Sequence, residues 1–197
     1  MFNLATHEKS KQAASAFRAV MNAMARPGQV ERLPVIEGEV GLVLPTSMTV
    51  LLSLCDHLTT VFLAPSLSSP EVVKALRFHH GSSVNEIPKH ADFAVIPISE
   101  AHLGLDQWQT GTHEYPDRST TLIVQASSFA DGPLQSFEGP GIQSACPVQI
   151  SGINSGFWAK RAEINAGYAL GLDLLFAKTD EIIGCPRSTR VTQAGGR

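Results

Sequence analysis

Residues 92–98 read DFAVIPI and residues 120–127 read TTLIVQAS. Each is a short run of mostly apolar residues without the polar–apolar alternation of a half-exposed strand. Such runs are typical of strands buried on both faces, as in sheets that carry helices on each side. The two runs therefore favour an α/β fold.

Three helical patterns precede or separate these runs. Thr6 is placed to cap the first helix, whose apolar face has the spacing i, i+3, i+4, i+7 and comprises Phe17, Val20, Met21 and Met24. The second begins at Pro45 and contains Met48, Leu51, Leu52, Cys55 and Leu58. The third has a serine cap, a proline in its first position, an acid in its first turn and a glycine stop, which are Ser69, Pro70, Glu71 and Gly81.

Shorter patterns fill the rest of the chain. Strands are expected at 29–33, 41–44, 59–64, 134–138, 171–177 and 181–184, the last two forming a hairpin. Helices are expected at 99–107 and from Ser155, with Phe157, Arg161 and Ile164 at helical spacing. No linker or repeat interrupts the pattern. We expect one domain over residues 1–197, an α/β fold with a mixed β-sheet sandwiched between helices, and a disordered tail at 192–197.

Composition narrows the class of protein. Charged residues make up 17% of the chain, below the roughly 25% of soluble domains, which hints at a surface covered by a partner. The net charge is −3 and no basic run occurs, so nucleic acid is not an expected partner. No apolar stretch approaches the roughly 18 residues that span a membrane, and MFNLATHEKSKQ does not resemble a signal peptide. We therefore expect a cytoplasmic protein.

Common catalytic motifs are absent from the sequence. GxxxxGK[ST], GxSxG and HExxH do not occur, and the three cysteines show no CxxC spacing, so a disulfide framework or a zinc knuckle is not expected. Cys55 is expected to be a buried thiol. Cys146 and Cys185, each before a proline, could be nucleophiles, although no His–Cys pairing is visible. No lysine stands at the end of an apolar strand with a serine-rich lead-in, where a Schiff-base lysine is often found, so no pyridoxal cofactor is expected.

Two glycine-containing stretches each allow two interpretations. GPG at 139–141 is either a turn or the start of a dinucleotide-binding loop, although its proline removes an N–H and no acidic residue follows at the right distance. SGINSG at 151–156 either holds a phosphate with free N–H groups or caps a helix through Asn154 or Ser155.

LRFHHG at 76–81 places an arginine and two histidines at a helix end. Adjacent residues of an extended segment point to opposite faces, so His79 and His80 are not expected to share a metal, but one of them could line a ligand pocket. Arginines also stand beside chain breakers or element ends, namely Arg26, Arg77, Arg187 and Arg190, and CPRSTR at 185–190 adds the hydroxyls of Ser188 and Thr189. Arginine binds phosphate or phosphonate with two parallel hydrogen bonds. The alternative is that these arginines satisfy carbonyls at helix ends or line a subunit interface.

Five fragments, in this order and at these separations, resemble the H subunits of the carbon–phosphorus lyase system, the PhnH family: FRAVMNAMARPG (17–28), LRFHHG (76–81), GPGI (139–142), GLDLLF (171–176) and IIGCPRSTRV (182–191). The resemblance covers residues 17–191. It implies the fold of pyridoxal-phosphate-dependent transferases without the cofactor, and a homodimer that joins the G, I and J subunits. It also implies a role with the G, I and L proteins, in which methylphosphonate attacks the ribose of ATP, adenine leaves and ribose 1-methylphosphonate 5-triphosphate forms.

The resemblance assigns no catalytic residue and no metal to the H subunit. The ligand-binding candidates that match its motifs are Arg26, Arg77, His79, Arg187, Thr189 and Arg190, together with Phe78. His80 stands where many relatives have a small polar residue, so His79 is the better candidate of the two.

Two hypotheses follow for function. In the first, the chain is a non-autonomous subunit that shapes a transferase complex in alkylphosphonate catabolism. In the second, it is an independent ligand-binding protein or transferase for a phosphonate or a nucleotide triphosphate. Arg77, Arg187 and Arg190 would then hold ATP or methylphosphonate, and His79 would move a proton. Convergence of these four side chains in one cleft would favour the second hypothesis.

Overall fold

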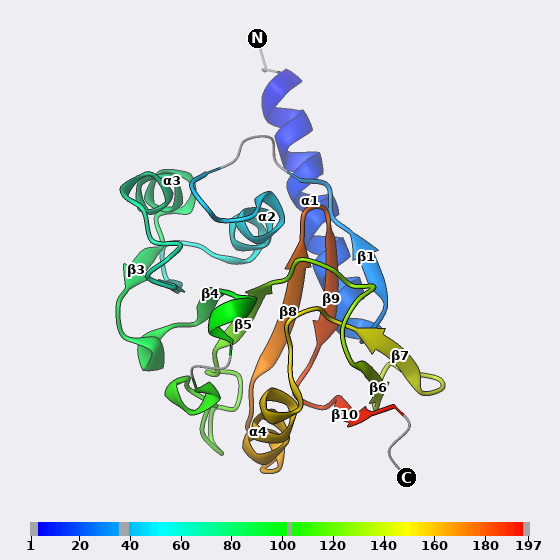
Figure 1. The fold of residues 1–197 in the computed structure, drawn as a ribbon. Helices are drawn as coiled ribbons and strands as arrows, with labels where there is room; N and C mark the ends of the chain where they lie inside the picture. The colour runs from blue at the N-terminus through cyan, green and yellow to red at the C-terminus, as the bar shows by residue number, and fades with distance from the viewer. Residues whose placement is uncertain (1–3, 36–39, 102–103, 195–197) are drawn as a thin grey trace.

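The computed structural model describes residues 4–35, 40–101 and 104–194, with the side chains of residues 4–10 and 80 outside the description. Within these ranges the chain forms a seven-stranded sheet, a three-stranded sheet and the helices around them (Figure 1). Across the large sheet the strands are β1 (Val30–Arg32), β9 (Glu181–Cys185), β8 (Asp173–Lys178), β5 (Thr121–Gln125), β4 (Phe93–Pro97), β2 (Thr60–Leu63) and β3 (Ser83–Asn85). The neighbours from β8 to β3 run parallel, whereas β9 is antiparallel to β8 and β1. The sheet is therefore mixed, as predicted.

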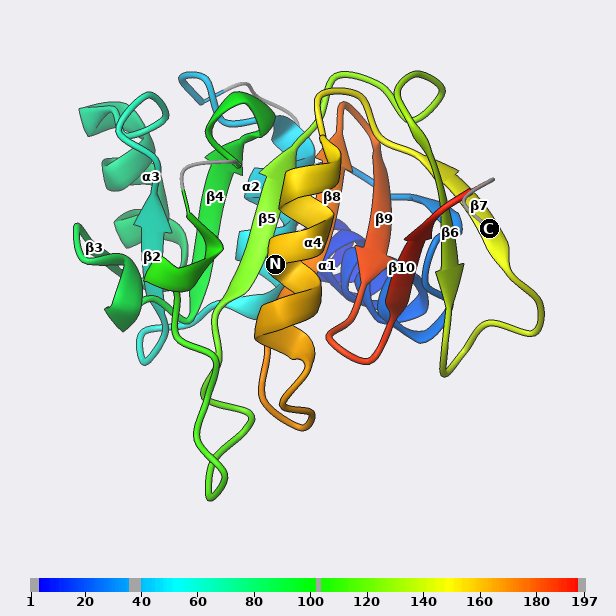
Figure 2. The same ribbon diagram turned by 60° about the horizontal axis from the view of Figure 1, so that its bottom comes forward.

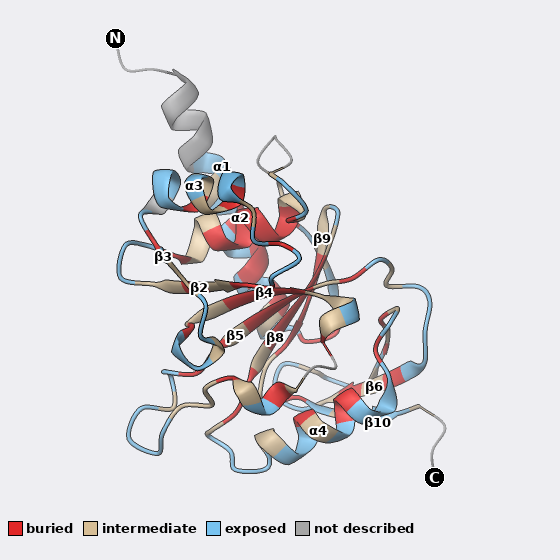
Figure 3. Cartoon of the chain, turned by 60° about the vertical axis from the view of Figure 1, so that its left-hand side comes forward, coloured by how far each residue is buried: buried red, intermediate tan, exposed pale blue. Residues whose placement is uncertain are grey.

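The centre of this sheet consists of the two runs that predicted it. Val95 of β4 pairs with Ile123 of β5, which pairs with Leu175 of β8. All three residues are buried. Figure 3 shows the central strands of the large sheet largely in the colour of buried residues. Strands whose middle residues are buried on both faces need cover on each side, and helices supply it.

The helices lie on both faces of the large sheet (Figure 2). On one face are α1 (Leu4–Ala25), α2 (Pro45–Leu54) and α3 (Pro70–His80); on the other are α4 (Ser155–Asn165) and the small sheet of β10 (Arg190–Gln193), β6 (Leu134–Glu138) and β7 (Cys146–Gln149). No described helix combines the length and the apolar character needed to cross a lipid bilayer.

The predicted signals at both ends of α3 are confirmed. The Ser69 hydroxyl accepts a hydrogen bond from the backbone N–H of Val72, and Pro70 occupies the first turn. Gly81 has φ 70°, a left-handed conformation that costs glycine little, and its N–H donates to the carbonyl of Arg77. The LRFHHG stretch is thus, first, the end of a well-capped helix.

The first helix buries a face that coincides only in part with the predicted one: Val20 is buried and Met24 packs partly buried against the core, whereas Phe17 and Met21 are exposed. Thr6 lies inside α1, so it is not the cap. Phe17 and Met21 are 44% and 51% exposed, and the buried residues are mostly small: Ala16, Ala19, Val20 and Ala23. Small residues are needed here because α1 approaches β9 closely, so that a Cβ on Gly184 would lie 2.3 Å from the carbonyl oxygen of Ala23.

Other predicted boundaries also change. Residues 41 and 42 form a turn closed by a single bridge between Val40 and Val43, in place of the strand expected at 41–44. Leu58, expected inside the second helix, lies after the end of α2 and is 79% exposed. The helix expected at 99–107 is replaced by two single-turn 3₁₀ helices, η2 (Ile98–Glu100) and η3 (Leu105–Gln107), and residues 102–103 lie outside the description. A third 3₁₀ turn, η1 (Pro88–His90), precedes β4.

The predicted tail and one strand need correction at the small sheet. Thr192 and Gln193 belong to β10 and pair with β6. The prediction of a disordered tail from residue 192 is therefore wrong for these two residues. Residues 195–197 lie outside the described part. Strand β7 was not predicted, because its short CPVQ sequence contains a proline, which is tolerated at the edge of a sheet.

Candidate functional site

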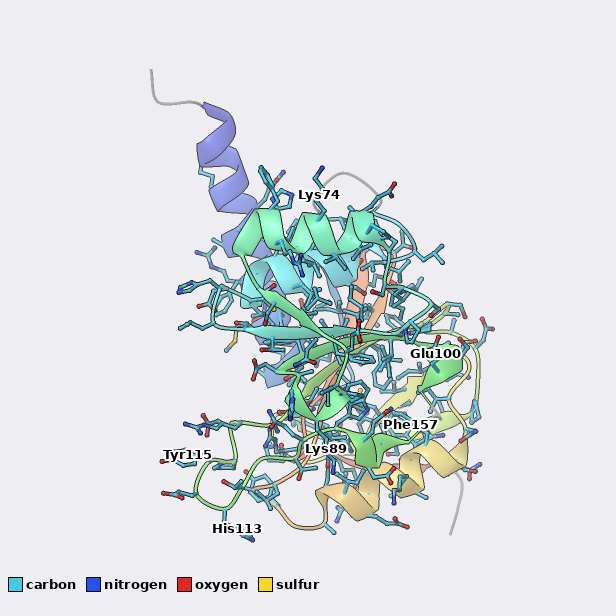
Figure 4. The ribbon with its side chains drawn as sticks, turned by 90° about the vertical axis from the view of Figure 1, so that its left-hand side faces the viewer. Lys74, Lys89, Glu100, His113, Tyr115 and Phe157 are labelled. Atoms are coloured by element: carbon cyan, nitrogen blue, oxygen red, sulfur yellow. The ribbon has the colours of Figure 1, made fainter. Side chains whose placement is uncertain are left out.

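The candidate residues fall into separate places and do not share one cleft. Arg187, Thr189 and Arg190 lie on or beside the link from β9 to β10 and line a cavity against α4. Arg77 lies on α3 and lines two adjoining hollows there. Figure 4 shows α3, which carries Lys74, and α4, which carries Phe157, on opposite sides of the large sheet. Arg26 is exposed at the end of α1.

One wall of the cavity is α4, which begins at the SGINSG stretch. The Asn154 side chain accepts a hydrogen bond of 3.0 Å from the N–H of Phe157. This stretch therefore serves as a helix cap, through Asn154 rather than Ser155. Phe157 and Trp158 are buried against the sheet. Their packing fixes the orientation of the helix and of the residue one turn further on, Arg161.

Arg161 lines the cavity although the sequence did not predict it as a site residue. It is 2% exposed, and its guanidinium donates to three backbone carbonyls, those of Thr189 at 2.9 Å, Pro186 at 2.6 Å and Cys185 at 3.3 Å. These acceptors are neutral, and within the described part of the chain Arg161 has no carboxylate partner. Arg161 therefore holds the β9–β10 link in place and keeps an uncompensated positive charge beside the cavity.

Two polar atoms at this place have no hydrogen-bond partner among the described residues. They are the Nε of Arg161 and the hydroxyl of Thr189, a residue that is also 2% exposed. Buried polar groups are nearly always paired, so unpaired ones next to a cavity indicate where a further group can be accommodated.

Arg187 is held in place by the protein itself. Its guanidinium pairs with the carboxylate of Asp173 at 2.5 Å and donates to the carbonyls of Pro116 at 2.6 Å and Ala169 at 3.2 Å and to the hydroxyl of Ser119. These bonds join the start of β8 to two loops. For Arg187, the alternative that it satisfies carbonyls describes the structure well.

Arg190 is held more loosely. It forms an ion pair of 2.7 Å with Glu138, its register partner on β6, and the two side chains are 73% and 40% exposed. Exposed pairs of this kind contribute only about 0–1 kcal/mol, so the Arg190 guanidinium can exchange its partner readily.

The cavity has a volume of about 530 Å³, within the range of small-molecule sites. Apolar atoms dominate its lining and come from Pro140, Trp158, Ala162, Ala166 and Val191. The GPG stretch contributes Pro140 and forms a turn in which the N–H of Ile142 donates to the carbonyl of Gly139, so the turn interpretation is supported.

The cysteines do not add a nucleophile. Burial raises the pKa of the Cys185 thiol to about 11 and that of Cys55 to about 12, and burial also raises the pKa of Cys146. The Cys185 thiol is therefore protonated at neutral pH. Cys55 is a buried thiol, as predicted.

A second candidate site lies along α3. Arg77 lines hollows of about 670 and 580 Å³ together with Val73 and Ser68. Phe78 is 82% exposed, and its ring meets the ring of His79 edge-on at 5.2 Å. The His80 side chain lies outside the description. In the described part of the chain, no three His, Cys, Asp or Glu side chains gather where they could hold a metal.

Sequence reasoning missed Arg161, Trp158 and Tyr168 as cavity residues. One signal was present: Phe157, Arg161 and Ile164 share a helical spacing, so an arginine stands among residues expected to face the core. A buried arginine is rarely placed without a specific set of acceptors.

The fold and the site define the class of protein: a mixed α/β protein with an arginine-bearing cavity, whose candidate residues do not form a catalytic constellation in the part described. The chain belongs to the family of bacterial phosphonate metabolism proteins (PhnH), whose family model matches residues 5–192.

Two relatives are similar to this chain over almost its whole length. The alpha-D-ribose 1-methylphosphonate 5-triphosphate synthase subunit PhnH of Rhizobium meliloti (strain 1021) is 34% identical over 180 residues, which cover 91% of this chain and 90% of the relative. The putative C-P lyase subunit protein HtxG of Stutzerimonas stutzeri is 29% identical over 182 residues, which cover 92% and 86%.

Proposed function

We propose that the chain is the H subunit of a carbon–phosphorus lyase system and acts in alkylphosphonate catabolism. With the G, I and L proteins it would support transfer of the ribose triphosphate moiety of ATP to methylphosphonate, with release of adenine. One observation carries this proposal: the family match spans residues 5–192, and both relatives bear the names of subunits.

The geometry supports a subunit that does not perform the chemistry alone. His79, the candidate proton carrier, lies on α3, whereas Thr189 and Arg190 lie on the other side of the sheet. Arg187 is bound to Asp173 and to carbonyls, and Cys185 is protonated at neutral pH. A general acid or base must reach the reacting group by a hydrogen bond, so these residues cannot serve one substrate together.

The end of α3 is our candidate for contact with another subunit. Phe78 presents an almost fully exposed ring between two basic side chains, Arg77 and His79. Aromatic and arginine side chains are enriched among residues that dominate binding at interfaces. A homodimer, attachment to the G, I and J subunits and a cytoplasmic location are further parts of the proposal. So is the fold of pyridoxal-phosphate-dependent transferases without the cofactor, which superposition on solved members of that class would test.

The test is reconstitution of the synthase. Adenine release from ATP and methylphosphonate is measured with the G, I and L proteins, with and without this chain. We expect release only when the chain is present, and none from the chain alone. Robust turnover by the isolated chain would contradict the proposal.

A matched pair of variants tests the α3 contact. Phe78→Ala should weaken co-purification with the partner subunits about tenfold or more, as for a central interface residue. Leu134→Ala, a 44% exposed position on β6 away from α3, should leave co-purification unchanged. Equal behaviour of the two variants would remove α3 from the interface.

The cavity beside α4 is the observation that favours the alternative function, a ligand-binding protein in its own right. Its volume and its buried arginine are those of a site rather than of a packing defect. Binding and assembly are compatible, and the two experiments separate them because binding can be measured on the isolated chain.

A further inference from the structure

The charges around the α4 cavity leave one positive charge without a counter-charge. Three arginines line it, Arg161, Arg187 and Arg190. Asp173 pairs with Arg187, and Glu138 pairs with Arg190. Arg161, the most deeply buried of the three, has only carbonyl oxygens as acceptors in the described part. A buried charge without a partner is costly, and an anion in the adjoining cavity would offset that cost.

The rest of the lining sets the character of the ligand. Apolar atoms of Trp158, Val191 and Pro140 dominate the surface, and Tyr168 lies at the same cavity with an exposed ring. An apolar body would displace water from this surface favourably. The hydroxyl of Thr189, which has no partner among the described residues, is buried beside the cavity, and the carbonyl of the same residue accepts a hydrogen bond from the Arg161 guanidinium.

We propose that this cavity binds a small organic acid that carries a single acidic headgroup, a carboxylate or a phosphonate, on an apolar body. The headgroup lies toward Arg161 and Thr189, and the body lies against Trp158 and Val191. One uncompensated cation matches one acidic group. A triphosphate brings several negative charges. Arg187 could meet them only by breaking its largely buried ion pair with Asp173, and the exposed Arg190 could supply at most one further cation.

The proposal does not rest on the subunit function, because it concerns the isolated chain. It is tested by NMR titration of the ¹⁵N-labelled full-length protein with butylphosphonate, pentanoate, butanol, inorganic phosphate and ATP. The chain has two tryptophans, and only Trp158 lines this cavity, whereas Trp108 lies elsewhere beside Phe62. We expect the indole signal of Trp158 to move with butylphosphonate or pentanoate and the signal of Trp108 to stay in place.

The choice of probes separates the contributions of charge and apolar body. Butanol should bind about tenfold or more weakly than the acids, since it carries no negative charge to offset that of Arg161. Inorganic phosphate and ATP should also bind more weakly than butylphosphonate. A preference between butylphosphonate and pentanoate then identifies which headgroup the cavity favours.

Substitutions at exposed positions test whether the ligand binds in the α4 cavity, and they leave the hydrophobic core unchanged. Ala162 and Ala159 are both exposed on α4, but only Ala162 lines the cavity. Ala162→Phe should reduce affinity about tenfold or more by occupying the space, and Ala159→Phe should not change it. Glu138→Gln releases Arg190 from its ion pair and should strengthen acid binding about two- to fivefold.

Three results would overturn the proposal. The first is no movement of the Trp158 signal with either acid at about 20 mM, well above a Kd of about 1 mM. The second is equal affinity of Ala162→Phe and Ala159→Phe, and the third is binding of butanol as strong as that of the acids. ATP binding at least as tight as butylphosphonate binding would overturn the single-charge assignment.

Discussion

Replacing Gly184 by alanine probes the contact between α1 and β9 that sets the position of the first helix. A Cβ at this position would lie 2.3 Å from the carbonyl oxygen of Ala23, 2.5 Å from its carbonyl carbon and 2.9 Å from the N of Met24. All three are backbone atoms, so no side chain can rotate away. Since ordinary contact begins near 3.4 Å, α1 has to withdraw from β9 by about 1 Å.

The expected loss of stability follows from this displacement. Overpacking costs about 1–3 kcal/mol, and a backbone obstacle places Gly184→Ala at the upper end, about 3 kcal/mol. In a chain of this length about 1 kcal/mol lowers Tm by roughly 2–4 °C, so we expect a loss of about 6–12 °C. Urea unfolding and thermal unfolding, both followed by circular dichroism, measure the two quantities.

The chain provides a matched control for this substitution. A Cβ at Gly167 has no heavy atom within 4 Å, and Gly167 is not among the glycines with positive φ. Gly167→Ala should be neutral or should stabilise by up to about 1 kcal/mol, because alanine restricts the unfolded chain. If Gly184→Ala and Gly167→Ala agree within about 0.5 kcal/mol, the close packing of α1 on β9 is refuted.

Three further predictions concern a cap, an ion pair and a thiol. Ser69→Ala should lower the free energy of unfolding by about 1 kcal/mol, measured in urea, because the N–H of Val72 loses its acceptor; a change below about 0.3 kcal/mol would argue against the cap. Asp173→Asn should cost about 3 kcal/mol, since it leaves the Arg187 guanidinium largely buried without its carboxylate, and stability unchanged by the substitution would contradict the bridge. Burial raises the pKa of Cys185 from its ordinary value of 9.0 to about 11, so the neutral thiol's contribution is complete below pH 9 and is lost as the pH rises toward 11. Unfolding measured from pH 8 to 11 should show stability falling, with a shallower fall in Cys185→Ala; identical slopes would contradict the burial.

The sequence predicted the fold where local signals agree with the tertiary environment. The apolar runs at 92–98 and 120–127 and the Ser69-to-Gly81 helix needed no long-range information, and the structure confirms them. The prediction from the sequence failed for part of α1, where the larger side chains of Phe17 and Met21 are exposed. Periodicity measures hydrophobicity along a helix, but the close approach to Gly184 selects the smallest residues, and that approach depends on a strand far along the chain.

The candidate site was predicted in part. Arg187, Thr189 and Arg190 do line a cavity, but Arg77 and His79 lie on the other side of the sheet. A motif such as CPRSTR identifies residues near one another in the chain, whereas the partners that decide their roles come from elsewhere. Asp173 neutralises Arg187, Ser119 accepts a hydrogen bond from it, and Arg161 reaches the link from α4. A spacing rule can show none of these contacts.

The large sheet ends on both sides in three-residue strands, β1 and β3. Such short edges give a neighbouring chain few free N–H and C=O groups on which to build another strand, so they protect the protein from edge-to-edge aggregation while it is still unassembled. This protection matters for a subunit that we propose to assemble with several partners, because its surfaces are uncovered before the complex forms. At the large sheet, partners would then recognise side-chain surfaces, because the backbone of its edges offers them little.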